Sequence, residues 1–173
     1  MANNLYFPDI KQNTSYDCGV VCVQSVLAYY GIEYTETKLA KMLKVSKKYG
    51  TSIAPIVKFF RYKKFKVEYG TFSAEQVKKY MRRKIPVIIL IQAWGEPGTD
   101  YTGINQYGHY VVVSGYNPKG FIIEDPGIFG RGFISYRNLE NRWHADDIKP
   151  VSHFGMAIWG KEPYDYNKLY PIP

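Results

Sequence analysis

Cysteine is scarce in this sequence, because Cys18 and Cys22 are the only two among 173 residues. They are four residues apart, and a helix that carried both would hold them in a poor geometry for a disulfide. A framework of disulfide bridges is therefore excluded, and a reducing compartment is the natural setting for the protein.

Long hydrophobic runs are also missing. The longest apolar stretch, residues 86–91, is far shorter than the roughly 18–20 residues that a membrane-spanning helix needs. The first seven residues lack the basic start and the apolar core of a secretory signal. There is no Gly-rich lysine loop of the Walker type. We therefore expect no membrane span, a cytoplasmic location and no cofactor.

Acidic side chains are rare between Lys38 and Lys84, where fifteen Lys and Arg residues stand against Glu68 and Glu75, a balance of +13. Such a segment projects a positive field that suits nucleic acid, an anionic membrane or an acidic peptide. A solvated lysine-rich surface is the alternative interpretation. Nucleic acid is the weaker choice, because the aromatic residues of this segment recur at helical spacing, which is typical of core positions. They are Phe59, Phe60, Tyr62 and Tyr80.

Helical periodicity and capping residues predict helices in the first half of the chain. An apolar stripe from Val20 closed by Gly31 marks the first helix, Thr35 caps the second, and Ser73-x-x-Gln76 is a capping box. The expected helices cover residues 17–30, 36–43, 52–62 and 73–83. A strand is expected at residues 65–69, and further strands at 86–92, 109–116, 121–124, 130–136 and 153–159, with one helical turn at 137–143.

Most helices thus precede most strands, without βα alternation. This order is typical of an α+β fold, in which an N-terminal helical half packs against a C-terminal antiparallel β-sheet. No internal repeat, low-complexity tract or linker divides the chain. We therefore expect residues 1–173 to form a single domain.

Cys18 lies in the first turn of the first expected helix. Backbone N–H groups and the helix dipole stabilise a negative charge there by about 0.3–1 kcal/mol, and helix N-termini lower the pKa of a thiol. Since the thiolate is the reactive form, Cys18 is a candidate nucleophile, with a small buried residue as the alternative. Cys22, one turn further among valines, is predicted to be an inert core residue.

A thiol nucleophile is best activated by a nearby imidazole, and the sequence contains three histidines. His109 opens an apolar strand and can face a cleft, whereas His144 and His153 lie near the C-terminus. Asp125 ends the next expected strand, so a tight turn between the strands can bring it beside His109 as an orienting acceptor. The alternative for Asp125 is a turn-forming Asp-Pro pair.

Attack on an amide carbonyl also needs donors for the oxyanion. The backbone N–H of Cys18 is one candidate. The side chain of Gln12, just upstream, is a second.

These residues lie in motifs that resemble those of bacteriocin-processing cysteine peptidases, papain-like domains that cut peptides after a double-glycine leader. The resemblance spans about residues 10–130. Its motifs are QNTSYDCGVVC from Gln12, VLAYYG from Val26, YGTS from Tyr49, GHYVVV from Gly108 and the pair DP at Asp125.

By this resemblance, Gln12 matches the oxyanion residue, Cys18 the nucleophile, His109 the base and Asp125 the orienting carboxylate. The implied papain-like fold places the nucleophile helix and the histidine strand on opposite walls of one cleft. The implied substrate is a peptide or protein cut after a small-residue, Gly-Gly-like site. Because leaders in this family are often acidic amphipathic helices, the basic segment 38–84 is expected to bind them.

Three features depart from the family pattern. Val21 occupies a place where such motifs often have a small residue. The loop from Trp94 to Tyr107 is longer than the usual connection and is expected to line or cover the cleft. The best-known members continue into a membrane transporter and a nucleotide-hydrolysing unit, and this sequence contains neither, so a standalone domain is expected.

Alternatives of other classes remain. A papain-like module can bind peptides without cutting them, and the same triad can transfer an acyl group to an amine, as in peptide ligases. A zinc site formed by Cys18, Cys22 and a histidine is disfavoured, because no second ligand pair follows at zinc-finger spacing.

Overall fold

The structure is a computed structural model that describes residues 4–169 and 171–172. Residues 1–3, 170 and 173 lie outside this description. No helix among the described residues is long and apolar enough to cross a membrane. The helices are α1 (Cys18–Tyr29), α2 (Glu36–Met42), α3 (Ile53–Tyr62), α4 (Ala74–Arg82) and α5 (Tyr136–Arg142).

The strands form one large antiparallel sheet and one small hairpin. The large sheet has the order β1-β8-β2-β3-β4-β5, and β6 pairs with β7 separately. The sheet strands are β1 (Lys66–Thr71), β2 (Val87–Gln92), β3 (Gly108–Asn117), β4 (Gly120–Glu124), β5 (Arg131–Ser135) and β8 (Phe154–Trp159), and the hairpin strands are β6 (His144–Asp146) and β7 (Pro150–Ser152). Every residue of β2 is buried, because this central strand is covered on both faces.

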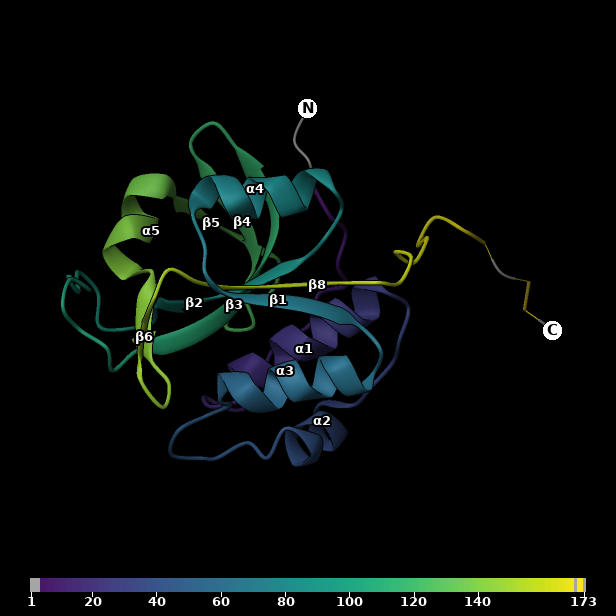
Figure 1. Cartoon of the computed structure of the whole chain (residues 1–173), viewed down its shortest axis with the longest axis horizontal. Helices are drawn as coiled ribbons and strands as arrows, with labels where there is room; N and C mark the ends of the chain where they lie inside the picture. Colours follow the sequence, from purple (N-terminus) through teal and green to yellow (C-terminus); the bar gives the residue numbers. More distant parts are fainter. Residues whose placement is uncertain (1–3, 170, 173) are drawn as a thin grey trace.

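Helices cover the sheet on both faces. Figure 1 shows α1, α2 and α3 on one face and α4 and α5 on the other. The predicted α+β class, with helices on an antiparallel sheet, is confirmed. Helix α4 lies on the face of the sheet opposite to α1, α2 and α3. In addition, β1 joins the sheet at its edge by pairing with the last strand, β8.

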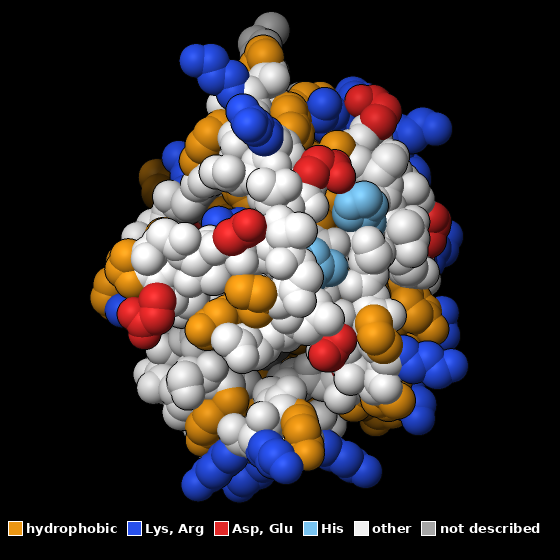
Figure 2. Space-filling model, turned by 90° about the vertical axis from the view of Figure 1, so that its left-hand side faces the viewer, with side chains coloured by type: hydrophobic (Ala, Val, Ile, Leu, Met, Phe, Trp, Pro, Cys, Tyr) orange, Lys and Arg blue, Asp and Glu red, His pale blue; other side chains and the backbone are white. Residues whose placement is uncertain are grey.

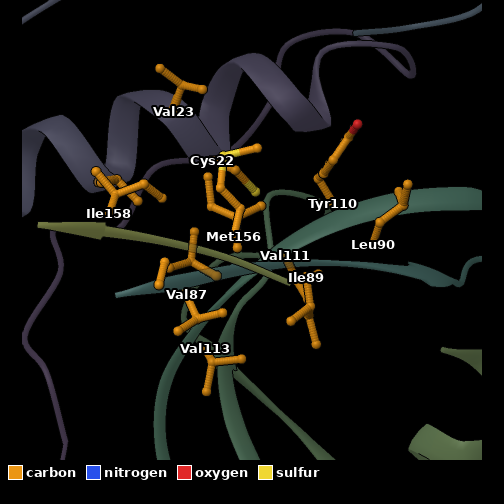
Figure 3. Close-up of a cluster of buried hydrophobic side chains, with 14 of the residues drawn as sticks. Cys22, Val23, Val87, Ile89, Leu90, Tyr110, Val111, Val113, Met156 and Ile158 are labelled. Carbon is orange, nitrogen blue, oxygen red and sulfur yellow. The ribbon is translucent and has the colours of Figure 1, made fainter. Parts of the chain in front are cut away.

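Helix α1 is almost entirely buried, with ten of its twelve residues in the core. Figure 3 shows Cys22 and Met156 between this helix and the strands. Burying an apolar side chain of this kind stabilises the fold by about 1.5–3 kcal/mol. The helix is therefore anchored along its length, and its first residue, Cys18, is held at a fixed place against the sheet.

Thr35 and Ser73 are confirmed as the N-caps of α2 and α4, although the side chain of Gln76 bonds to Glu68 rather than back to the Ser73 N–H. The backbone N–H of Lys38 donates to Thr35 Oγ1 over 3.3 Å, and that of Gln76 donates to Ser73 Oγ over 3.1 Å. At the end of α1, Gly31 takes a φ of +72°, and a Cβ there would lie 2.5 Å from the ring of Tyr164. Only glycine permits this close contact, through which the C-terminal segment packs on the end of the helix.

Two parts of the fold were not predicted. The β6–β7 hairpin was missed because strands of three residues show no periodicity. The positive segment 38–84 was treated as one surface, but its side chains belong to α2 and α3 on one face and to α4 on the other. Figure 2 shows Lys and Arg side chains gathered at the top and at the bottom of one side of the molecule.

The aromatic residues of this segment are mainly core residues, as their spacing indicated. Phe59, Phe60 and Tyr80 are buried, whereas Tyr62 is 74% exposed. A row of bases stacking on these rings is therefore not available on α3 and α4.

Candidate active site

Cys18 is the first residue of α1, and its side chain is only 8% exposed. The next residue, Gly19, lets the start of the helix approach the sheet closely. A Cβ on Gly19 would lie 2.9 Å from Thr51 Cβ and 3.1 Å from the ring of Tyr110 in β3. The Cys-Gly pair thus combines a thiol at a helix N-terminus with close packing against the strand that carries His109.

His109 and Asp125 come from neighbouring strands of the sheet. Val112 in β3 is paired with Glu124 in β4, and Asp125 follows directly after β4. The His109 Nε2 atom lies 2.7 Å from Asp125 Oδ1, and both side chains are buried. Because Nε2 faces the carboxylate, the other ring nitrogen, Nδ1, is the atom left to interact with Cys18.

The environment of Cys18 favours a thiolate. Burial raises the pKa of the Cys18 thiol, but the hydrogen bond and charge of His109 outweigh this effect, and the net pKa is lowered. Backbone N–H groups of Tyr110 and Gly19 contribute in the same direction. The thiolate is the nucleophilic form of cysteine.

The pKa of His109 moves in the complementary direction. Burial lowers the pKa of the imidazole, but its hydrogen bonds to Asp125 and Cys18 and their negative charges raise it to about 9. Burial raises the pKa of Asp125, and the interactions with His109, the Gly127 N–H and Trp94 lower it below its usual value. The three groups therefore favour a thiolate–imidazolium pair beside a carboxylate.

Gln12 lies on the rim of the same cleft. Its backbone N–H donates to the carbonyl of Pro126 over 2.9 Å, which joins the segment before α1 to the turn after Asp125. Its side-chain Nε2 donates to the carbonyl of Thr14 over 2.6 Å. The amide nitrogen carries two hydrogens, so one N–H remains beyond that bond.

A cleft of about 440 Å³ opens at this place, lined by residues that include Gln12, Trp94, Gly108, His109 and Gly127. The loop from Trp94 to Tyr107 contributes to its wall, as predicted. The cleft lies on the side of the molecule at which α1 begins, the side that Figure 2 presents to the viewer.

The other two histidines have different partners. His144 Nδ1 lies 2.9 Å from Asn105 Oδ1, and His153 Nε2 lies 3.2 Å from a carboxylate oxygen of Glu140. Glu124 is buried beside Asp125, and burial raises its pKa. Within the part of the chain that the structure describes, no three His, Cys, Asp or Glu side chains are grouped as a metal ion would require.

Two contributions to the site were not predicted from the sequence. The backbone N–H of Tyr110 assists the thiolate, and Trp94 interacts with Asp125. The Asp-Pro-Gly run was a usable signal for a third, since it predicts a turn in which Asp125 Oδ1 accepts the Gly127 N–H, here over 2.8 Å.

A helix-borne thiol facing a strand-borne imidazole, across an α+β fold, is the architecture of papain-like cysteine peptidases. The comparison with known families agrees with this class. The chain belongs to the peptidase C39 family, whose model matches residues 7–146.

Solved structures show the same fold. A double-glycine motif protease from an AMS/PCAT transporter, in complex with the leader peptide, is 20% identical, with a TM-score of 0.66 over 90% of this chain and 92% of that chain. The peptidase domain of Streptococcus ComA, a bifunctional ABC transporter involved in quorum sensing, is 22% identical, with a TM-score of 0.62 over 89% of this chain and 97% of that chain. The predicted resemblance to peptidases of the double-glycine type is thus confirmed at the level of family and fold.

A curated relative is the SPbeta prophage-derived sublancin-168-processing and transport ATP-binding protein SunT of Bacillus subtilis (strain 168). It is 25% identical over 119 residues, which are 67% of this chain. The matched region is 15% of the relative's length.

Proposed function

We propose that this chain is a cysteine peptidase that cuts a peptide after a small-residue, Gly-Gly-like site. Cys18 acts as nucleophile, His109 as base and acid, and Asp125 as the residue that orients His109. The observation that carries the proposal is the buried His109–Asp125 hydrogen bond of 2.7 Å next to a cysteine whose pKa is lowered by the same histidine. Membership of the peptidase C39 family supports it.

The proposed reaction follows from these positions. Cys18 Sγ attacks the scissile carbonyl carbon, and a C–S bond forms while negative charge develops on the carbonyl oxygen. The backbone N–H of Cys18 and the free N–H of Gln12 serve as donors to that oxygen. His109 then gives its proton to the leaving amine, and the C–N bond breaks. Water, deprotonated by His109, attacks the acyl-enzyme and releases the acid.

The substrate class is inferred from the relatives. One similar structure holds the leader peptide of a double-glycine motif protease, and the curated relative is named for processing a peptide, sublancin. We therefore propose that this chain processes a leader peptide. The transport functions in those names are not carried over, because the match covers a small part of the relative.

The leader is proposed to be acidic and to bind the basic surface of α2 and the loop that follows it. The start of α2 lies next to the segment that lines the cleft. Asn13 follows Gln12 of the cleft wall, and its backbone N–H donates to Glu36 Oε1 at the start of α2 over 3.2 Å. The basic surface of α4 lies across the sheet and serves as a matched control. Exposed charges of this kind act mainly on association and are screened by salt.

The surface test compares two double variants. Lys41→Gln with Lys47→Gln should raise KM for an acidic leader about fivefold at low salt, since exposed pairs contribute up to about 1 kcal/mol. Lys79→Gln with Arg83→Gln, at the C-terminal end of α4, should leave KM unchanged. Equal effects of the two doubles, or a KM that is insensitive to salt, would remove the acidic-leader proposal.

The activity itself is tested with a peptide that carries an acidic helical leader followed by Gly-Gly. We expect cleavage after the second glycine, detected by mass spectrometry, and no cleavage by Cys18→Ala. Addition of a primary amine distinguishes hydrolysis from acyl transfer, because a transferase yields the amide instead of the acid. Tight binding of the peptide by wild-type protein without any product would favour a peptide-binding module instead.

A further inference from the structure

Trp94 has an unusual backbone conformation for a large residue. Its φ is +62°, in the left-handed region, which costs a non-glycine residue about 1 kcal/mol or more. Hydrogen bonds on both sides hold it there. The Ala93 N–H donates to the Tyr107 carbonyl over 3.0 Å, and the Gly95 N–H donates to Tyr101 Oη over 3.0 Å. The loop therefore imposes this conformation on Trp94.

The indole ring lies over the Asp-Pro-Gly turn. A Cβ built on Gly127 would lie 2.8 Å from Trp94 Nε1 and 3.1 Å from Asp125 Oδ1. The indole nitrogen and the carboxylate oxygen thus face the same glycine. A side chain at position 127 would push the indole away, so the missing Cβ is what lets Trp94 reach Asp125.

The indole N–H adds to the donors that surround the Asp125 carboxylate. Oδ1 already receives His109 Nε2 at 2.7 Å and the Gly127 N–H at 2.8 Å. Trp94 Nε1 faces the same glycine as this oxygen, and its interaction with the carboxylate lowers the pKa of Asp125. An indole N–H can only donate. It therefore stabilises the ionised carboxylate without competing for the proton of His109.

We propose that Trp94 is a positioning residue, whose indole N–H fixes the Asp125 carboxylate toward His109 and whose ring forms the wall of the cleft beside their hydrogen bond. Trp94 is 60% exposed, whereas Asp125 and His109 are buried. The inference rests on the proposed function, because it assigns Trp94 a role in the same site. This role explains why the loop begins with a residue in a strained backbone conformation.

A positioning role for Trp94 also affects the reactivity of Cys18, without any contact between the two residues. If the carboxylate is held less firmly, the imidazolium of His109 is stabilised less, and so is the thiolate that depends on it. Loss of the indole N–H should therefore raise the pH at which Cys18 becomes reactive. A residue that only filled space in the loop would not move this pH.

The test measures iodoacetamide alkylation of Cys18 against pH, together with kcat and KM. Trp94→Phe keeps a ring but loses the N–H, and should raise the midpoint by about 0.5 pH unit. It should lower kcat about threefold, with KM nearly unchanged. Gly127→Ala should produce a similar shift with Trp94 still present. Thr102→Ala, an exposed position of the same loop, is the control and should behave as wild type.

Wild-type midpoints and kcat in both Trp94→Phe and Gly127→Ala would overturn the role of Trp94. The proposed function would stand in that case, provided that His109→Ala still abolishes the low-pH reactivity of Cys18. If His109→Ala changes nothing, the thiolate–imidazole pair itself is absent, and both proposals fail.

A second measurement is an NMR titration of the wild-type protein, with a variant used only to assign one signal. The indole N–H signal of Trp94, assigned by its loss in Trp94→Phe, should shift with pH as His109 titrates near its pKa of about 9. The indole of Trp143, which donates to the Phe154 carbonyl over 2.9 Å, is the internal control and should stay constant. A Trp94 signal that does not move over this range contradicts the proposal.

Discussion

The first and second turns of α1 each carry a buried cysteine, and the two differ in their polar partners and in the direction of their pKa shifts. Cys18 meets His109 and two backbone N–H groups, and its pKa is lowered although it is buried. Cys22, one turn further, is fully buried, and burial, with the negative charges of Cys18 and Asp125, raises its pKa well above the usual value. The same residue type on the same helix is thus placed in opposite environments.

The comparison indicates which contacts would make Cys18 the reactive cysteine under the proposed function. The helix dipole acts within the first turn and contributes about 1 kcal/mol or less. The larger contribution at Cys18 comes from His109 on β3, which is supported by Asp125 after β4. The proposed nucleophile therefore depends on two neighbouring strands, the first of which begins about ninety residues further along the chain.

The strongest way to test the comparison is to remove each cysteine in turn. Cys18→Ala should abolish peptide cleavage, with a loss of about 10⁴-fold or more in kcat. Cys22→Ala should cleave at nearly the wild-type rate, because its sulfur faces the core. Both rates are measured with the Gly-Gly peptide. Retained activity in Cys18→Ala would exclude it as the nucleophile.

Asp125→Asn tests the support behind the histidine. The amide keeps the shape of the side chain but loses the charge that stabilises the imidazolium, so kcat should fall by about 10²-fold or more. The pKa of His109 should also fall, which NMR titration of the imidazole measures. An unchanged pKa of His109 would show that the charge of Asp125 does not stabilise the imidazolium.

The pH dependence of activity follows from the two shifts at Cys18 and His109. The active pair exists above the lowered pKa of Cys18 and is lost as the pH rises through the His109 pKa of about 9. A plot of kcat/KM should therefore be bell-shaped, with a descending limb about tenfold per pH unit above pH 9. A profile that keeps rising to pH 10 would contradict a protonated His109.

The smallest expected effect concerns stability at Cys22. Cys22→Ala removes a fully buried sulfur and leaves a small cavity, so the free energy of unfolding should fall by about 1 kcal/mol. Urea denaturation measures this difference, with Cys22→Val as a partner that refills the space. A loss of activity larger than the loss of folded protein would show that Cys22 does more than pack.

The sequence supported the positions of α1 and the strands that carry the site, because each has a clear physical signal. Gly31 marked the end of the helix, and the apolar run after His109 marked β3. The different roles predicted for Cys18 and Cys22 followed from their positions in the helix, one in the first turn and one a turn further among valines. The pairing of His109 with Asp125 required the additional step of placing β3 beside β4, which the tight turn between these strands indicated.

Other features depend on contacts that no local pattern records. Helix α4 lies on the face of the sheet opposite to α1, α2 and α3, and nothing in its own sequence indicates that face. The contact of Trp94 with Gly127 joins a strained loop residue to a glycine in a separate turn. Nothing near either residue in the sequence indicates that contact.

The central claim, that His109 makes Cys18 and not Cys22 a thiolate, is tested most directly by alkylation. Wild type and His109→Ala are treated with iodoacetamide over a range of pH, and fragment masses assign the label to each cysteine. We predict that wild-type Cys18 reacts fast well below pH 8, that His109→Ala slows it at least about tenfold, and that Cys22 stays slow in both. Cys18 reacting as slowly as Cys22 at neutral pH in both proteins would contradict the account.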